Sequence, residues 1–174
     1  MSKIKGHVYK EIKPGKKRGK TFLAKTVFWF LGRGAQATAK YDSNAKAEVY
    51  SWEDGMTILL KVESNGPVMA IGKRKGKLLY LGSKEITADI TIYFKNIEAA
   101  LLVLTGRIGI AQAFAEHRFT LKGDIAEGMS VVRCLTTVEA YLFPKFITKK
   151  IIKRMPKKEC SSFKVYTATL FGIK

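Results

Sequence analysis

The stretch that decides the fold runs from residue 86 to residue 124 and reads ITADITIYFKNIEAALLVLTGRIGIAQAFAEHRFTLKGD. In its first nine residues an apolar side chain occurs at every second position, from Ile86 to Phe94. This alternation is typical of a β-strand with one face on a core. Asn96 then supplies an N-cap for a short helix, and a second short helix is expected over 108–116.

The segments that follow return to a strand and then to a long helix. HRFTLKG (117–123) places Phe119 and Leu121 on one face of a strand. Asp124 is the expected N-cap of the helix, with Glu127 three residues later as in a capping box. Apolar residues in this helix recur at three- and four-residue spacing, which predicts one buried stripe: Ile125, Met129, Val132, Leu135 and Val138.

Upstream of this stretch, the sequence predicts helix first and strands second. A helix is expected from about 21 to 31, and the GRG sequence (32–34) weakens its continuation, so that any helix within 35–50 would be a separate one. One strand is expected over 56–62, where alternate residues are apolar. PVMAIGKRKGKLLYLG (67–82) is typical of two strands joined by a tight basic turn.

Downstream, KFITKKIIKRM (145–155) predicts a basic amphipathic helix. The tail FKVYTATLFGI (163–173) is compatible with either a strand or a helix. Strands therefore follow one another directly instead of alternating with helices. This order indicates an α+β fold, with a mainly antiparallel sheet and helices on one face.

The formal net charge of +18 is concentrated at the two ends of the chain. Residues 1–20 carry +7 and residues 145–174 carry +8, whereas the middle is nearly neutral. Residues 1–19, rich in lysine and glycine, are expected to form a flexible basic arm, and 20–174 a single domain. Basic blocks of this kind attract phosphate, either on nucleic acid or on an anionic bilayer.

Few residues point to metal chemistry or to export. Cys134 and Cys160 form no CxxC pair, and His7 and His117 lack a metal-binding spacing, so neither a metal nor a cofactor is expected. No apolar run approaches the roughly 20 residues that a membrane-spanning helix needs. The one segment that resembles a secretion signal has too short an apolar region, so we expect a cytoplasmic protein.

The TGRIG sequence (105–109) has the glycines of a phosphate-binding loop but not the pattern. It matches neither GxxxxGK[ST] nor GxGxxG, and it lies between helices, so Gly106 is interpreted as a helix stop. His117 has no recognisable nucleophile partner and is interpreted as a polar residue at a helix-to-strand junction. Cys134 is interpreted as a small hydrophobic residue of a helix. No catalytic residue is assigned, and we expect the protein not to be an enzyme.

The short helices carry more apolar residues than one buried stripe requires. IEAALLVL, IGIAQAFA and YLFPKFITKKII are apolar over wide arcs of the helix. A second surface must then cover them, supplied either by another helix or by a ligand in a cavity. Periodicity alone favours helix packing over the cavity.

Residues 86–144 nevertheless resemble the sterol carrier protein 2 (SCP-2) family. The matching pattern is a strand ending in Phe94, a short helix, the Thr105-Gly106 step, an apolar helix containing A-x-A, a basic strand ending in KGD and a long helix. The resemblance is weaker over 35–85. It implies a five-stranded sheet covered by helices, enclosing an apolar cavity that receives sterols, fatty acyl chains or other lipids.

The function implied by this resemblance is non-catalytic binding of an apolar lipid, with transfer of the lipid or its presentation to a lipid-processing enzyme. The lipid could be fatty acyl, sterol-like or isoprenoid. Candidate cavity residues are Ile97, Leu101, Leu104, Ile108, Ile110, Phe114, Met129, Val132, Phe143, Phe146, Ile147 and Ile151. Candidate contacts to an anionic membrane, at which the protein would be peripheral, are Lys145, Lys149, Lys150, Lys153 and Arg154.

A basic nucleic-acid-binding protein is the alternative from another class. Single-stranded nucleic acid is usually bound with aromatic side chains interleaved among the basic ones. The basic ends of this chain lack such a ladder of aromatics. Nucleic acid is therefore the less favoured partner, and the oligomeric state stays open.

Overall fold

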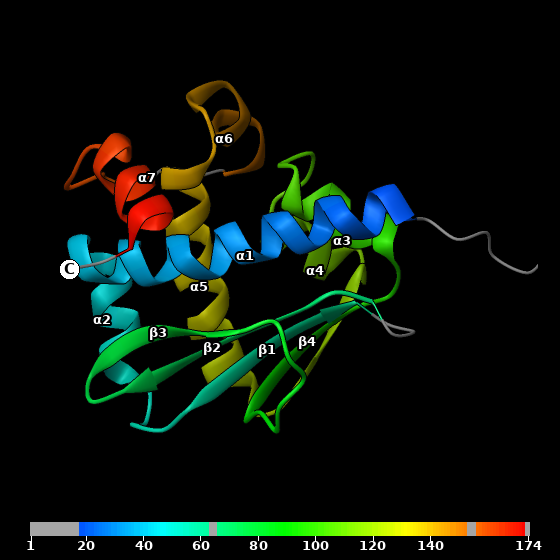
Figure 1. Ribbon diagram of the computed structural model, residues 1–174, viewed down its shortest axis with the longest axis horizontal. Helices are drawn as coiled ribbons and strands as arrows, with labels where there is room; N and C mark the ends of the chain where they lie inside the picture. Colours follow the sequence, from blue (N-terminus) through cyan, green and yellow to red (C-terminus); the bar gives the residue numbers. More distant parts are fainter. Residues whose placement is uncertain (1–17, 63–65, 153–155, 173–174) are drawn as a thin grey trace, which may run out of the picture.

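The computed structural model describes residues 18–62, 66–152 and 156–172. One five-stranded sheet forms the base of the molecule, and the helices are stacked over one of its faces (Figure 1). Seven helices occur within the described residues. The α+β class expected from the sequence is confirmed.

The sheet is mixed, because one of its four strand pairings is parallel. Its strands are β1 (Thr57–Val62), β2 (Val68–Arg74), β3 (Lys77–Gly82), β4 (Ile90–Phe94) and β5 (Phe119–Lys122). They lie in the order β3-β2-β1-β4-β5, with β1 and β4 parallel and the other pairs antiparallel. The expected hairpin is present, with Lys75 and Gly76 as its two-residue loop.

Strand β4 is shorter than the alternation of the sequence predicts. Ile90 pairs with Ile58, close to the first residue of β1, so residues 86–89 have almost no neighbouring strand beside them. Ile86 is accordingly exposed, whereas Ile90 and Ile92 are buried in the core. The prediction of a strand from residue 86 was wrong at its start because pairing, rather than alternation, ends a strand.

Helix α1 (Arg18–Tyr41) is continuous through the two glycines that were expected to interrupt it. A Cβ atom on Gly32 would lie 2.5 Å from Tyr80 Cδ2 on the sheet, and one on Gly34 would lie 2.7 Å from Leu142 Cδ1. Both glycines are therefore places where α1 touches a neighbour too closely for a side chain. The expected break was wrong for this reason. Residues 1–17 of the expected basic arm lie outside the described residues.

Helix α2 (Ser43–Ser51) is capped by Asp42, which is buried and hydrogen-bonded through both of its carboxylate oxygens. Asp42 Oδ1 accepts the backbone N–H groups of Asn44 and Ala45, at 3.0 and 3.1 Å. Its Oδ2 accepts the hydroxyl of Tyr141 at 2.6 Å, and the Tyr141 oxygen in turn accepts the backbone N–H of Glu159 at 2.9 Å. One carboxylate thus ties the α1–α2 junction to α5 and to the segment before α7.

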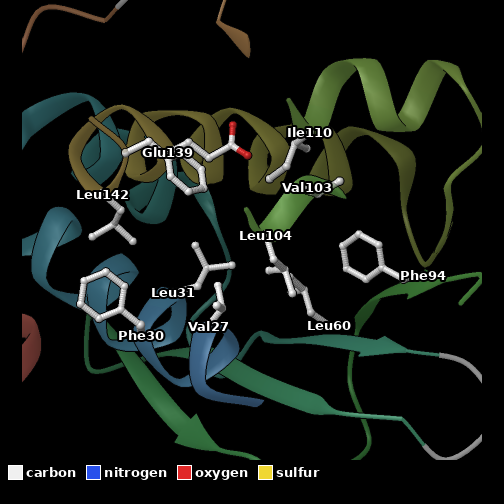
Figure 2. A pocket seen from close by; sticks show the side chains of 11 residues that line it. Val27, Phe30, Leu31, Leu60, Phe94, Val103, Leu104, Ile110, Glu139 and Leu142 are labelled. Carbon is white, nitrogen blue, oxygen red and sulfur yellow. The ribbon is translucent and has the colours of Figure 1, made fainter. Parts of the chain in front are cut away.

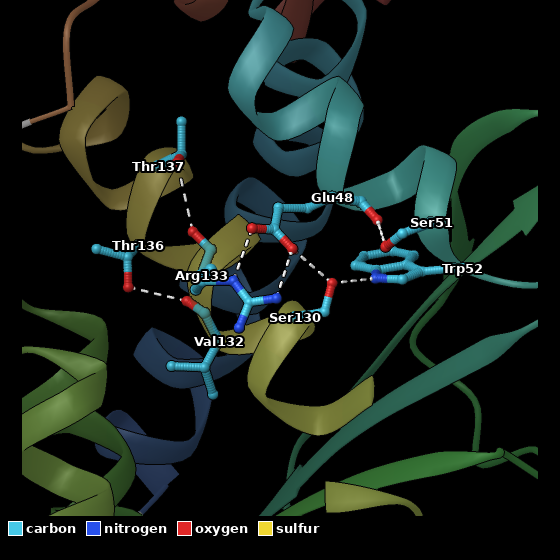
Figure 3. A network of polar contacts seen from close by, with 8 residues as sticks. All are labelled: Glu48, Ser51, Trp52, Ser130, Val132, Arg133, Thr136 and Thr137. Atoms are coloured by element: carbon cyan, nitrogen blue, oxygen red, sulfur yellow. Dashed lines mark hydrogen bonds and ion pairs between the residues drawn. The ribbon is translucent and has the colours of Figure 1, made fainter. Parts of the chain in front are cut away.

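Helix α5 (Ile125–Leu142) is fastened to α2 by a second polar network (Figure 3). The indole N–H of Trp52 donates to Ser130 Oγ at 2.7 Å, and the Ser130 hydroxyl donates to Glu48 Oε2 at 2.7 Å. Arg133 donates to both oxygens of the same carboxylate, at 2.7 and 3.0 Å. These bonds from Arg133 lower the pKa of Glu48, and the ion pair closes the contact between the two helices.

The first turn of α5 differs from the buried stripe expected there. Ile125 and Met129 are exposed, whereas Val132 and the later members are buried. A Cβ on Gly128 would lie 2.3 Å from Leu121 Cδ1, so it is the Gly128 side of the helix that meets the sheet. The prediction was wrong at its start because a glycine contact sets the orientation of this turn.

The remaining helices are α3 (Ile97–Leu104), α4 (Ile110–Ala115), α6 (Lys145–Ile151) and α7 (Ser162–Phe171). Of these, α3 and α4 pack near the sheet, whereas α6 and α7 lie beyond α1, farther from it (Figure 1). Helix α6 ends at Ile151, and 153–155 of the expected basic helix lie outside the described residues. The tail is helical rather than a strand, and its Tyr166 stacks on Phe30 of α1 with ring centroids 5.9 Å apart.

Candidate functional site

The turn between α3 and α4 sets the position of α6. Gly106 has a φ of +66°, and its N–H donates to the Val103 carbonyl at 2.9 Å, while Arg107 N–H donates to the Leu102 carbonyl at 2.9 Å. This pair of bonds is the Schellman motif, which ends a helix at a left-handed residue. Gly106 is therefore a helix stop, as the sequence predicted.

Helix α6 lies directly against this turn. A Cβ on Gly106 would lie 2.5 Å from Ile147 Cγ2, and one on Gly109 would lie 2.5 Å from the Ile151 carbonyl oxygen. Real Cβ atoms essentially never come so close to other atoms. Because Gly106 and Gly109 have no side chains, α6 packs directly on the backbone of this turn.

An apolar hollow lies near this turn, between α1, the sheet and α5 (Figure 2). It is here called the inner pocket. Its volume is about 50 Å³. Its lining residues are Val27, Phe30, Leu31, Leu60, Phe94, Val103, Leu104, Ile110, Glu139, Leu142 and Phe143. Ligand pockets typically measure roughly 300–1,000 Å³, so the inner pocket as it stands would hold only the end of a lipid chain.

A larger hollow, here called the outer groove, runs between α4, α5 and α6. Its volume is about 660 Å³, within the range of ligand pockets. Its lining residues are Ile110, Ala111, Gln112, Ala115, Thr136, Glu139, Lys150, Ile151 and Ile152. Ile110 and Glu139 line both hollows, so the inner pocket and the outer groove are neighbours that share one wall.

Glu139 is the acidic member of that shared wall. Its side chain is 3% exposed, and its carboxyl group points from α5 toward Ile110 (Figure 2). Burial raises the pKa of Glu139 to about 8, and a hydrogen bond from the Ile110 backbone N–H opposes part of that rise. A raised value means that Glu139 is mostly a neutral carboxylic acid at pH 7, with an O–H to donate.

The candidate cavity residues fall into three groups in the structure. Leu104, Ile110 and Phe143 line the inner pocket, and Ile110 and Ile151 line the outer groove. Val132 is buried in the core, and Ile97, Leu101, Ile108 and Ile147 are half-buried; none of these five lines either hollow. Phe114, Met129 and Phe146 are exposed, at 40%, 37% and 68%, and line neither hollow.

Several residues of the inner pocket were not among the candidates. Val27, Phe30 and Leu31 come from α1, which the sequence resemblance covers poorly, although TVFWFL is apolar on all sides. Glu139 is a polar residue outside the apolar stripe that the sequence predicts for α5. A single acid within the apolar run from Val138 to Phe143 was the available signal.

The candidate membrane contacts that the structure describes are on α6. Lys145, Lys149 and Lys150 are all exposed, and so is Phe146 of the same helix. Lys150 also borders the outer groove. Lys153 and Arg154 lie outside the described residues. None of the helices described is long and apolar enough to cross a bilayer.

The surroundings of His117 and Cys134 do not suit covalent or metal chemistry. His117 sits at the turn before β5 with a φ of +52°. Burial raises the pKa of the Cys134 thiol to about 12, so the nucleophilic thiolate is scarce at neutral pH. Across the described ranges, His, Cys, Asp and Glu side chains form no cluster of three that could hold a metal ion.

The fold and the hollows together define a small α+β domain whose apolar pocket meets a groove beneath a basic helix. Solved structures of sterol carrier protein 2 domains overlap with it. One is the sterol carrier protein 2 of Yarrowia lipolytica in its apo form, with 11% identity, 67% of this chain and 91% of that chain covered, and a TM-score of 0.46. Another is the sterol carrier protein domain 2 of Helicoverpa armigera, with 17% identity, 76% and 98% covered, and a TM-score of 0.45.

A third is described as "UbiJ-SCP2 Ubiquinone synthesis protein", with 15% identity, 72% of this chain and 100% of that chain covered, and a TM-score of 0.40. These structures carry the name of the family that residues 86–144 resemble. No family model matches the chain. No curated protein matches it in sequence.

Proposed function

We propose that the protein binds an apolar lipid without catalysis, with the lipid body in the outer groove and the end of its chain in the inner pocket. The observation that carries the proposal is the wall shared by the two hollows at Ile110. Each buried CH₂ group contributes about 0.8 kcal/mol, so a long chain needs few polar contacts. The resemblance to the SCP-2 family points to the same use of this region.

The inner pocket has to widen when a longer chain enters it. Helix α6 is the element suited to give way, because it has only seven residues and packs on fewer elements than α1 does. Helix α1, in contrast, is held by the sheet on one side and by Leu142 on the other. We infer that ligands enter between α4 and α6, and that the protein carries the lipid or presents it to an enzyme.

Replacing Val27 with tryptophan tests the inner pocket. The larger ring would occupy the space into which the chain end inserts, and we expect affinity for a neutral fluorescent long-chain lipid to fall at least roughly tenfold, the equivalent of about 1.4 kcal/mol. The matched control is Leu23→Trp, about one turn earlier on α1, where the side chain is exposed and lines neither hollow. Equal binding by both variants would exclude the inner pocket as the lipid site.

We further propose that α6 rests on an anionic membrane surface. A lysine close to such a surface contributes about 1 kcal/mol, so Lys145→Gln, Lys149→Gln and Lys150→Gln together should weaken binding to anionic vesicles roughly a hundredfold. Flotation with phosphatidylcholine vesicles, with and without phosphatidylserine, measures this. Neutral vesicles should bind wild type and variant equally weakly.

The control for this experiment removes the same charge elsewhere. Lys77, Lys84 and Lys122 are exposed residues of the sheet and its loops, away from α6. Replacing these three lysines by glutamine weakens only the long-range attraction between the protein and the anionic vesicle. Flotation should therefore stay within about twofold of wild type. A gel shift with nucleic acid at matched salt is run on all three proteins. Tight nucleic-acid binding without flotation would favour the alternative function.

A further inference from the structure

We propose that the Glu139 carboxyl group is the head-group site for the bound lipid, donating a hydrogen bond to a neutral carbonyl or hydroxyl oxygen. This inference rests on the proposed function, because it assigns the class of lipid that the two hollows would take. It excludes fatty-acid carboxylates as the preferred ligands. It predicts esters, ketones, quinone-like rings or alcohols with long apolar tails.

The position of Glu139 carries the proposal. The other residues of the inner pocket are apolar, and Glu139 stands where that pocket adjoins the outer groove. A tail lying in one hollow and a polar end lying in the other would therefore place the polar atom near this carboxyl. Glu139 is 3% exposed on an otherwise apolar wall, so a hydrogen bond from it to a ligand oxygen would form away from water.

The protein satisfies only part of the hydrogen-bonding capacity of the Glu139 carboxyl group. The Ile110 backbone N–H donates to the carboxyl, which uses one acceptor position. No ion pair within the described part of the chain includes Glu139. A protonated carboxyl has one O–H to give and further lone pairs to receive, so a ligand oxygen can complete the set.

The charged groups near the site fit a neutral ligand. Of the side chains that line the two hollows, Lys150 on α6 is the one titratable group besides Glu139, and it is exposed at the groove. The lining side chains from α1, α3, β1 and β4 are all uncharged. A ligand carboxylate in the inner pocket would meet no cation there and would lose its hydration, which disfavours the charged form.

The expected behaviour depends on the proton of Glu139. Burial holds its pKa near 8, so the O–H is present at pH 6.5 and lost by pH 9.5. Above that value the site holds a carboxylate, which repels a carbonyl oxygen. Ligands with a neutral oxygen should therefore bind more weakly as the pH rises, whereas an alkane of the same length has no hydrogen bond to lose.

The experiment compares three probes of equal chain length, a methyl ester, the free carboxylic acid and the n-alkane. Each probe displaces a neutral fluorescent lipid from wild type, Glu139→Gln and Glu139→Leu at pH 6.5 and pH 9.5. For wild type we expect the ester to bind about tenfold more tightly at pH 6.5 than at pH 9.5, and more tightly than the acid at pH 6.5. Glutamine keeps a donor at all pH values, so Glu139→Gln should bind the ester equally at both.

Leucine has no donor, so Glu139→Leu should lose about three- to tenfold of its preference for ester over alkane at pH 6.5. The inference is overturned if wild type and Glu139→Leu show the same ester-over-alkane preference, or if wild type binds the acid as tightly as the ester at pH 6.5. In either case the alkane still binds, and the proposed function stands. Failure of all three probes to bind any of the proteins would instead overturn the proposed function, and this inference with it.

Discussion

Replacing Glu139 with glutamine should remove a fall in stability of about 4 kcal/mol that wild type undergoes between about pH 5 and pH 9. The pKa of Glu139 is raised from 4.5 in the unfolded chain to about 8 in the folded protein, because the group is buried. The folded state therefore holds a proton that the unfolded state has released. Stability from this group is present in full below pH 4.5 and is lost as the pH rises through 8.

Urea unfolding of wild type and Glu139→Gln across this pH range measures the effect as the difference between the two proteins. The control is Glu116→Gln, at the C-cap of α4. Glu116 is exposed, and its pKa is lowered, first by the hydrogen bond from Gln112 and then by that from Arg118. It is ionised in both states above pH 5, so this control should keep the pH dependence of wild type. Parallel curves for wild type and Glu139→Gln would show that Glu139 does not titrate in this range.

Replacing Asp42 with alanine should lower the free energy of unfolding by about 3 kcal/mol. Loss of an N-cap costs roughly 1 kcal/mol, and loss of a hydrogen bond to a charged acceptor costs roughly 1.5–3 kcal/mol. Asp42 supplies both, to α2 and to Tyr141, and the change also leaves the buried Tyr141 hydroxyl without its acceptor. Urea denaturation measures the loss.

Two variants separate the contributions. Asp124→Ala removes an exposed cap of α5 that makes a single bond to the Glu127 N–H, so it should cost only about 1 kcal/mol. Tyr141→Phe removes the hydroxyl and keeps the cap, and it should cost less than Asp42→Ala. A loss for Asp42→Ala no greater than that of Asp124→Ala would mean that the bond to Tyr141 contributes nothing to stability.

The sequence predicted those parts of the fold that depend on local patterns. The caps at Asn96 and Asp124, the Lys75-Gly76 hairpin and the helix stop at Gly106 all depend on residues near one another in the chain. Such signals can be read from a single sequence, because the hydrogen bonds that satisfy them are local. The α+β class followed from the order of these elements.

The errors arose where a distant contact decided the outcome. Gly32 and Gly34 suggested a helix break, but Tyr80 and Leu142 lie against them and need the space. The exposed start of α5 has the same origin, in the contact of Gly128 with Leu121. A glycine that makes room for a neighbour and a glycine that ends a helix are identical in sequence, and only the partner distinguishes them.

The candidate site also combines residues that local sequence patterns reveal with residues that only distant contacts bring together. The apolar excess of the short helices and the family resemblance both pointed to Leu104, Ile110 and Phe143, which line the inner pocket. The contribution of Val27 from α1 could not be foreseen, because nothing near it in the chain reveals what lies opposite. Glu139 was visible as a lone acid, but its neutral state depends on burial among helices that are far away in sequence.

The glycine contacts of α1 also give the site two sides of unequal mechanical stiffness. Gly32 and Gly34 let α1 pack closely on Tyr80 and Leu142, and α1 also packs on α2, α3 and α7, whereas α6 packs mainly on α5 and on the turn after α3. Any change in the volume of the inner pocket must therefore be taken up on the opposite side, at α6 and the turn beneath it. Sequence changes in α1 would then set the shortest dimension of the ligand, and changes in α6 the ease of its exchange, so the two properties could evolve separately.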